Sequence, residues 1–224
     1  MKTSKYQEIL EELTSILKGN TLDAIVPPLI FVFMNHLFSL PIAIFSAIGV
    51  AASFGLMRII KQQKSIYALT GLGGVLLAGG FALLANNATN FFLPGIISNV
   101  FFLLVMFISI VIGRPLAALA SHITRGWSLD WFLRPDIKPA YTEVTWMWLA
   151  LFIMRTALQI FLYTQESINQ LAWTNLLLGL PFTILVLVIS YDYGIWRLKQ
   201  LKGPGIEEFN EHKHPPYKGQ TRGF

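Results

Sequence analysis

The sequence predicts an all-α, polytopic membrane protein with six transmembrane helices, and three observations support this prediction. Hydrophobic residues make up 54% of the chain and charged residues only 13%, about half the charged share of a soluble domain. The apolar residues form six stretches of about 20 residues, the length that a helix needs to cross the hydrocarbon core of a bilayer. Lysine and arginine gather in the segments at one side of these stretches, which fixes an expected orientation.

The chain divides into three predicted parts. Residues 1–20 are expected to form an amphipathic helix at the membrane interface, because apolar residues recur there at helical spacing. Residues 21–198 are expected to form the six-helix membrane domain. Residues 199–224 are rich in glycine, proline and charge, which predicts a cytoplasmic tail with little structure of its own that binds a partner.

The six predicted spans follow one another with short connections, except at one place. They are Leu22–Leu40, Pro41–Ile60, Ile66–Ala85, Phe91–Gly113, Tyr141–Gln165 and Leu176–Leu198. The exception is a long loop, Arg114–Ala140, which carries Trp127, Trp131 and Phe132 among charged residues. In the third span, Gly74, Ala78 and Ala82 form a stripe of small residues that favours close helix packing.

The positive charges predict how the chain is oriented. Of its 17 lysines and arginines, all except Arg155 lie in the N-terminal segment, the loop after the second span, the long loop or the tail, or at a span end that adjoins one of these, as Arg58 and Arg197 do. Because such segments stay in the cytoplasm, both termini are expected there. We expect a bacterial inner membrane or a thylakoid-type membrane, with membrane lipids as partners. Charges of this kind are normal for the inner face of a membrane protein, so they do not indicate a nucleic-acid partner.

Arg155 is the most informative single residue, because it lies near the middle of the fifth span. A guanidinium at that depth is costly unless it faces protein, water or an anion. Gln159 lies one turn further along, and Asn99 of the fourth span is the expected amide partner. Two interpretations remain open. In one, Arg155, Gln159, Asn99 and Asn35 bind a small anion or an anionic lipid headgroup; in the other, Arg155 is a structural tie between helices.

Prolines near the starts of the first, fourth and sixth spans invite comparison with transporters built from inverted repeats. Val26–Ile30 loosely echoes Leu93–Ile97, which is compatible with a weak 3+3 inverted repeat. The echo is short, and prolines near helix starts are common, so we favour ordinary kinks.

The sequence gives little support for a cofactor or for catalysis. His36 could ligate a haem or a pigment such as chlorophyll, but no second histidine follows at helical spacing, so we favour a hydrogen bond to a neighbouring helix. We predict no metal site. The absence of a nucleophile beside a base argues against an enzyme.

Several short segments carry a resemblance to a known family. They are Val26–Pro28 with Asn35, Phe92–Gly95 with Asn99, Arg114–Pro115, and Leu151–Gln159. In these segments the chain resembles a domain-of-unknown-function family of bacterial six-span inner-membrane proteins, which is distantly similar to the intracellular septation protein A group. The resemblance covers roughly Leu22–Leu198 and implies the six-span topology but no activity. The tail departs from the pattern, so Tyr217, Arg222 and Phe224 are predicted to dock a specialised partner.

Two functions therefore remain open. The first is a non-enzymatic, transporter-like membrane protein with an intramembrane polar pocket around Arg155. The second is an accessory or assembly subunit of a larger membrane complex, docking through its tail and long loop. Truncation after Leu201 is expected to separate them, because only a docking subunit would leave its complex.

Overall fold

The computed structural model describes residues 25–62, 65–221 and 223–224. The predicted amphipathic helix of residues 1–20 and the predicted docking residue Arg222 therefore lie outside the described residues. Within the described ranges the regular elements are helices, and no strand occurs, so the all-α prediction is confirmed.

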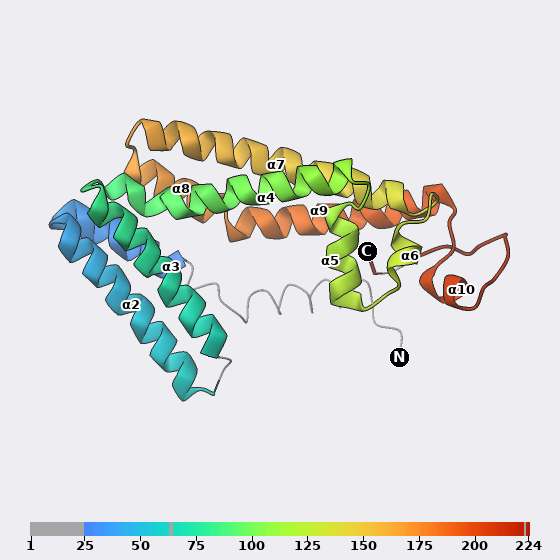
Figure 1. Cartoon of the computed structure of the whole chain (residues 1–224), viewed down its shortest axis with the longest axis horizontal. Helices are drawn as coiled ribbons and strands as arrows, with labels where there is room; N and C mark the ends of the chain where they lie inside the picture. The colour runs from blue at the N-terminus through green and yellow to red at the C-terminus, as the bar shows by residue number, and fades with distance from the viewer. Residues whose placement is uncertain (1–24, 63–64, 222) are drawn as a thin grey trace. The chain divides into compact units, whose positions relative to one another are not determined.

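The helices follow one another along the chain as Figure 1 labels them. After an apolar helix at Ile25–Leu37 come α2 (Leu40–Ile60), α3 (Ser65–Leu84), the 3₁₀ helix η1 (Ala88–Phe92), α4 (Leu93–Val111), α5 (Leu116–Arg125), α6 (Leu129–Phe132), α7 (Lys138–Thr164), α8 (Ile168–Leu177), α9 (Leu180–Leu201) and α10 (Ile206–Asn210).

Four stretches of the described chain are long and apolar enough to cross a membrane. They are Leu40–Ile60, Ala88–Val111, Lys138–Thr164 and Ile168–Leu201. Two shorter apolar helices, Ile25–Leu37 and Leu69–Leu84, coincide with the first and third predicted spans. These helices indicate an integral membrane protein. The count of six spans, the orientation of the termini and the kind of membrane stay predictions.

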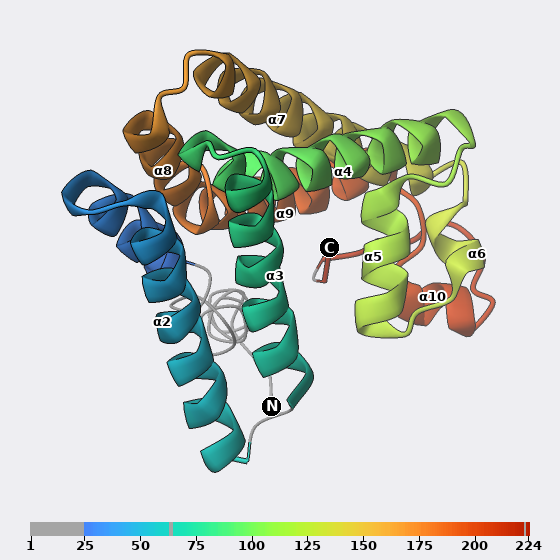
Figure 2. The ribbon, with the colours of Figure 1, turned by 60° about the vertical axis from the view of Figure 1, so that its left-hand side comes forward.

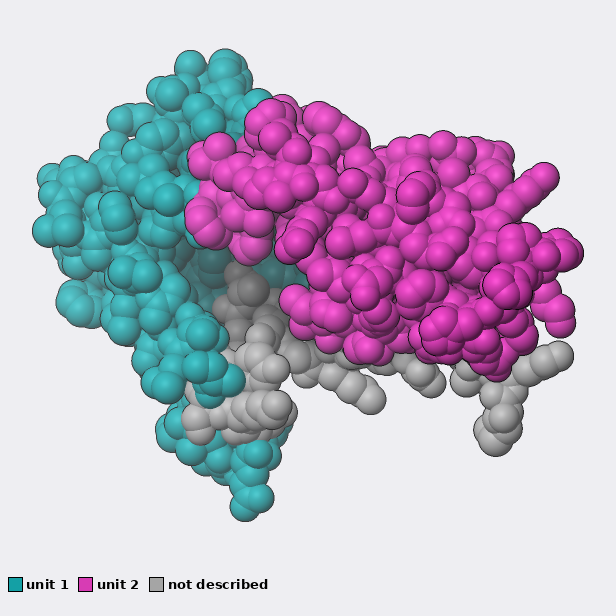
Figure 3. Space-filling model, turned by 45° about the vertical axis from the view of Figure 1, so that its right-hand side comes forward, with its two compact units in different colours: residues 1–98, 156–182 teal, residues 99–155, 183–224 magenta. Residues whose placement is uncertain are grey.

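The chain forms two compact units, coloured separately in Figure 3. Unit 1 comprises Met1–Ser98 and Thr156–Phe182, and unit 2 comprises Asn99–Arg155 and Thr183–Phe224. Each unit has its own buried cluster of hydrophobic residues.

In unit 1, α2 and α3 lie side by side (Figures 1 and 2). Small side chains are buried along both helices; they are Ala43, Ala47 and Ala51 on α2 and Ala78 and Ala82 on α3. Gly79 belongs to this contact as well, because an added Cβ would lie 2.7 Å from Cγ2 of Ile44. The predicted stripe is correct for Ala78 and Ala82, but Gly74 is exposed and Gly79 makes the close approach instead.

The unit 1 core also contains three aromatic residues, Phe31, Phe91 and Phe92. The rings of Phe31 and Phe91 stack with centroids 3.9 Å apart, and Phe92 meets both rings edge-on. Phe91 and Phe92 lie on η1, which begins after Asn87. The Asn87 side chain accepts a hydrogen bond from the Thr89 N–H at 2.8 Å and so caps η1.

Two segments of the chain are more helical than the sequence predicted. The connection expected between the fifth and sixth spans contains α8, which is followed by a break at Gly179 before α9 begins. An added Cβ at Gly179 would lie 2.2 Å from the carbonyl oxygen of Asn175, so only glycine fits there, and Pro181 then suits the first turn of α9. The long loop contains α5 and α6.

The core of unit 2 forms around the segment Arg114–Ala140, which was predicted to be a loop. Its buried members are Ala118, Trp131, Phe132, Ile137, Ala140, Tyr141 and Leu198. The tail contributes Ile206, Phe209 and Phe224 to the same cluster. The tail is therefore not the weakly structured segment that its composition predicted: it contains α10 and packs against an aromatic core. These contacts are made with residues that are far away in the sequence. The composition of the tail alone therefore could not predict that the tail is packed.

Candidate functional site

Arg155 lies in the second half of α7 and belongs to unit 2. Its side chain is partly buried. The Nε atom is fully buried and has no hydrogen-bond partner among the residues that the structure describes. A buried charged donor without an acceptor costs free energy. This geometry marks the guanidinium as a group that needs an anionic or polar ligand.

Thr156 and Gln159 continue along α7 and belong to unit 1. The Thr156 hydroxyl is buried and has no partner within the described ranges. Gln159 is only 1% exposed, and its Nε2 donates a hydrogen bond to Oδ1 of Asn175 on α8. Gln159 therefore ties α7 to α8, and whether Arg155 is also a structural tie stays a prediction.

Asn99, the expected partner of Arg155, lies partly buried on α4 in unit 2. The Nε atom of Arg155 does not bond to it, since that nitrogen has no partner in the described part of the chain. Arg155 and Asn99 both lie on apolar helices and both belong to unit 2. Their combination with Gln159 and Asn35 into one site stays a prediction.

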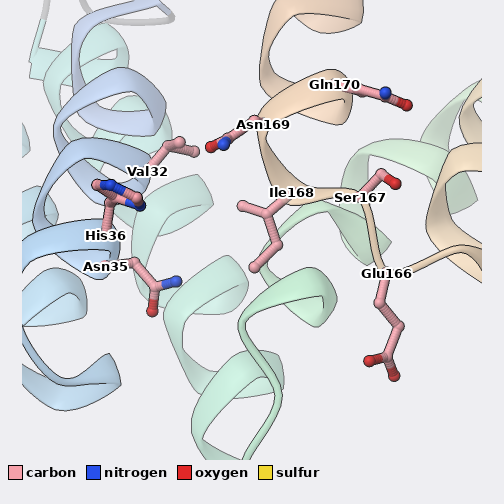
Figure 4. A pocket seen from close by; sticks show the side chains of 8 residues that line it. All are labelled: Val32, Asn35, His36, Glu166, Ser167, Ile168, Asn169 and Gln170. Carbon is pink, nitrogen blue, oxygen red and sulfur yellow. The ribbon is translucent and has the colours of Figure 1, made fainter.

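Asn35 and His36 lie at a cavity of about 430 Å³ within unit 1. The other lining residues are Val32, Glu166, Ser167, Ile168, Asn169 and Gln170. Figure 4 shows the Ile168 and Asn169 side chains pointing toward the helix that carries Val32 and His36. Among the described residues, no lysine or arginine lines this cavity, so the charge of that lining does not favour an anion. The role of His36 as a haem or pigment ligand stays a prediction.

Glu166 lines this cavity, but its carboxylate is hydrogen-bonded to a residue outside the described cavity lining. Its side chain points away from His36 in Figure 4, and its Oε1 accepts a hydrogen bond from Nδ2 of Asn87 at 2.9 Å. The nearby Tyr163 hydroxyl donates to Oδ1 of Asn90. These bonds connect the turn before η1 to the end of α7. They explain why the polar residues after the third span are ordered.

The end of the tail packs into unit 2. The ring of Phe224 stacks on that of Tyr141, with centroids 4.3 Å apart and planes 6° from parallel. Nη2 of Arg125 donates to the backbone carbonyl of Phe224 at 3.0 Å. The N–H of Gly223 donates to the Tyr191 hydroxyl at 3.0 Å. Sequence reasoning missed this site, although aromatic residues both in the long loop and at the chain end were a signal for it.

Glu208 holds the middle of the tail in place. Its carboxylate accepts hydrogen bonds from the backbone N–H groups of Gly205, Lys218 and Gly219, at 2.8 to 3.0 Å. These bonds, from Lys218 above all, lower the pKa of Glu208 below its ordinary value. Trp131 fixes the start of the tail by donating Nε1–H to the carbonyl of Pro204 at 2.9 Å.

The two predicted docking residues that the structure describes have different surroundings. Tyr217 is partly buried. The ring of Phe224 lies against Tyr141 of its own chain. Their role in docking a partner stays a prediction. By contrast, residues 211–216 are all exposed and form a continuous accessible segment of the tail.

An ion pair near the start of α7 shows how a charge is accommodated when a partner is present. The Glu143 carboxylate accepts from Nε and Nη2 of Arg197, each at 2.8 Å, and from the Tyr193 hydroxyl at 2.8 Å. This bidentate geometry gives two N–H donors of the guanidinium a carboxylate oxygen each. The Nε atom of Arg155, by contrast, donates no such hydrogen bond to any described residue.

Comparison with known proteins identifies one match. The family model "Protein of unknown function (DUF3159)" matches residues 18–199, which includes Arg155 but excludes most of the tail. No curated protein and no solved structure matches the chain. The match confirms the resemblance to an uncharacterised domain family. The distant link to the septation protein A group stays a prediction.

Proposed function

We propose that this chain, which belongs to the family of proteins of unknown function DUF3159, is a non-enzymatic, transporter-like integral membrane protein that binds a small anion or an anionic lipid headgroup at Arg155. One observation carries the proposal. The Nε atom of Arg155 is buried within an apolar helix and has no hydrogen-bond partner in the described residues.

The chemistry of the guanidinium favours an oxyanion as the ligand. A guanidinium presents N–H groups in a planar fork that matches two oxygens of a phosphate or carboxylate. Such a bond would satisfy the Nε donor and would neutralise a charge that is costly at this depth. The described lining of the cavity around Asn35 does not supply this chemistry, because its ionisable groups are His36 and Glu166. The proposal therefore rests on Arg155.

The change Arg155→Leu tests the proposal through the sign of its effect on thermal stability in detergent. In anion-free buffer the variant should have a higher Tm than the wild type, because the substitution removes an unsatisfied buried donor. Inorganic phosphate or phosphatidylglycerol should raise the Tm of the wild type only, by the equivalent of about 2.7 kcal/mol at a hundredfold excess over Kd.

The two ligands distinguish the sources of the anion. A response to phosphate alone identifies a soluble anion, whereas a response only to phosphatidylglycerol identifies a headgroup. Lys199→Leu is the matched control, because Lys199 is exposed and its loss should leave the response unchanged. The proposal is wrong if Arg155→Leu responds to both ligands as the wild type does.

The alternative function, an accessory or assembly subunit of a larger membrane complex, is best examined at residues 211–216. Truncation after Leu201 would remove Phe209 and Phe224 from the core of unit 2, so its effect on a complex would be ambiguous. Replacing the exposed residues 211–216 with six glycine and serine residues leaves that core in place. Loss of a co-purifying partner from this variant would favour the subunit role, and its retention would count against docking through this segment.

A further inference from the structure

We propose that unit 2 contains a recognition pocket for a glycine–phenylalanine segment, which the chain fills with its own Gly223–Phe224 as a removable ligand. The pocket lies among α5, the start of α7 and the second half of α9, and Figures 1 and 2 place the C-terminus beside α5. The proposal is independent of the function proposed for Arg155.

The pocket first recognises an aromatic ring. Tyr141, fully buried at the start of α7, provides the flat surface on which the Phe224 ring stacks. The Tyr141 ring is itself fixed by Phe132, with centroids 5.0 Å apart and planes at 81°. Stacked and edge-on pairs of this kind favour an aromatic side chain over an aliphatic one.

Another side of the pocket is formed by Gly194, which has no side chain. Gly194 lies in the interior of α9, and a Cβ added there would lie 2.2 Å from the Phe224 ring. Glycine inside a helix costs about 1 kcal/mol relative to alanine. The space that Gly194 leaves is occupied by the Phe224 ring, so the glycine gives the pocket its shape.

The residue before the phenylalanine is also selected. Gly223 has φ of +72°, and an added Cβ would lie 2.6 Å from Cη2 of Trp127. Both the backbone conformation and the nearby indole therefore exclude a larger L residue. The Gly223 N–H is paired with the Tyr191 hydroxyl, so this position is recognised through its backbone.

Arg125 completes the recognition from α5. Its Nη2 donates to the Phe224 carbonyl at 3.0 Å, and its guanidinium lies over the Trp127 ring at 5.3 Å from the centroid. The pocket thus contacts the ring, the glycine Cα and two backbone groups of a two-residue segment. Phe224 stays partly exposed, so the segment has a route by which to leave and to be replaced.

A peptide supplied in trans tests whether the pocket recognises this segment. In the full-length chain, Phe224→Ala should lower the Tm in detergent by about 5 °C, because a stacked aromatic ring is lost. A peptide of residues 218–224, Lys-Gly-Gln-Thr-Arg-Gly-Phe, should restore at least half of that loss at millimolar concentration. The same peptide with alanine in place of its phenylalanine, or in place of its second glycine, should restore none. Equal effects of the three peptides would overturn the proposal.

A double-mutant cycle keeps the proposal testable even if Phe224→Ala folds poorly. Gly194→Ala should lower the Tm of the wild type, because its Cβ meets the Phe224 ring, but should leave the Tm of a Phe224→Ala or Phe224→Gly chain unchanged or higher. Gly49→Ala is the matched control, since an added Cβ there meets nothing within 4 Å. An equal loss from Gly194→Ala with and without the Phe224 ring would show that no pocket is shared, and would contradict the proposal.

Discussion

The cores of the two units are stabilised in different ways. In unit 1 the buried residues are mainly small or aliphatic, as at Ala47 and Ala82, and the helices meet through the shapes of their surfaces. In unit 2 aromatic side chains also make hydrogen bonds to distant backbone groups, such as that from Trp131 to Pro204. Unit 1 also has side-chain hydrogen bonds, such as that from Asn87 to Glu166, but the contact between α2 and α3 is made mainly by small residues, which favour close packing of helices in lipid. A subdomain built from a loop and a tail needs specific polar contacts between remote segments.

Removing Trp131 should give the largest effect on this comparison. Its side chain is 0% exposed and is hydrogen-bonded to Pro204. Trp131→Ala should reduce the free energy of unfolding by about 3–5 kcal/mol, because it leaves a cavity and an unpaired carbonyl. Denaturant titration in detergent micelles, followed by tryptophan fluorescence, measures the loss.

Trp173 provides the control for that measurement. It is 60% exposed on α8 in unit 1, so Trp173→Ala should change the free energy of unfolding by less than about 0.5 kcal/mol. Similar losses from the two variants would show that unit 2 does not depend on its aromatic core, and the contrast between the units would fail.

An added methyl group should have an intermediate effect in unit 1. Gly79→Ala places a Cβ 2.7 Å from Cγ2 of Ile44, so α2 and α3 must separate or repack, at a cost of about 1–3 kcal/mol. Gly74→Ala, on the same helix, meets nothing within 4 Å and should stabilise slightly through helix propensity. Thermal unfolding of the two variants should therefore shift in opposite directions. If both shift upward, the α2–α3 contact is not closely packed.

The smallest effect should come from the tail and should depend on pH. The pKa of Glu208 is lowered by the backbone N–H groups that its carboxylate accepts from, Lys218 first. A lowered pKa means that this stabilisation is present above the ordinary glutamate pKa and is lost as the pH falls through the folded value. Glu208→Gln should therefore lower the Tm slightly at neutral pH, and this difference should shrink below the ordinary glutamate pKa.

Lys199→Leu serves as the control, because Lys199 is exposed on α9 and is not among the groups that lower the pKa of Glu208. A difference between wild type and Glu208→Gln that stays constant down to acid pH would show that the carboxylate does not hold the tail through these hydrogen bonds.

The sequence predicted what hydropathy and periodicity determine. The apolar helices lie where they were expected, and Arg155 is partly buried in one of them. The sequence did not predict α8, because Ser167 just before it and Asn169 and Gln170 in its first turn are polar and resemble a loop. Their side chains line a cavity, which helical periodicity does not report.

The contacts of the tail could also not be predicted from the sequence. The bond between Arg125 and Phe224 joins residues 99 positions apart, and no local pattern pairs two such segments. Similarly, Gln159 was expected beside Arg155 in a ligand site, whereas its Nε2 bonds to Asn175. Which polar residue binds which is decided by tertiary packing, so the sequence could point to polar residues in apolar helices but not to their partners.

Native mass spectrometry of the protein released from mild detergent tests the role of Arg155 most directly. The wild type and Lys199→Leu should each carry a bound phosphate-containing species, either inorganic phosphate or an anionic lipid. Arg155→Leu should lose that species while keeping its neutral lipids. Equal retention of the anionic species by Arg155→Leu, or its absence from all three proteins, would contradict the proposed anion site.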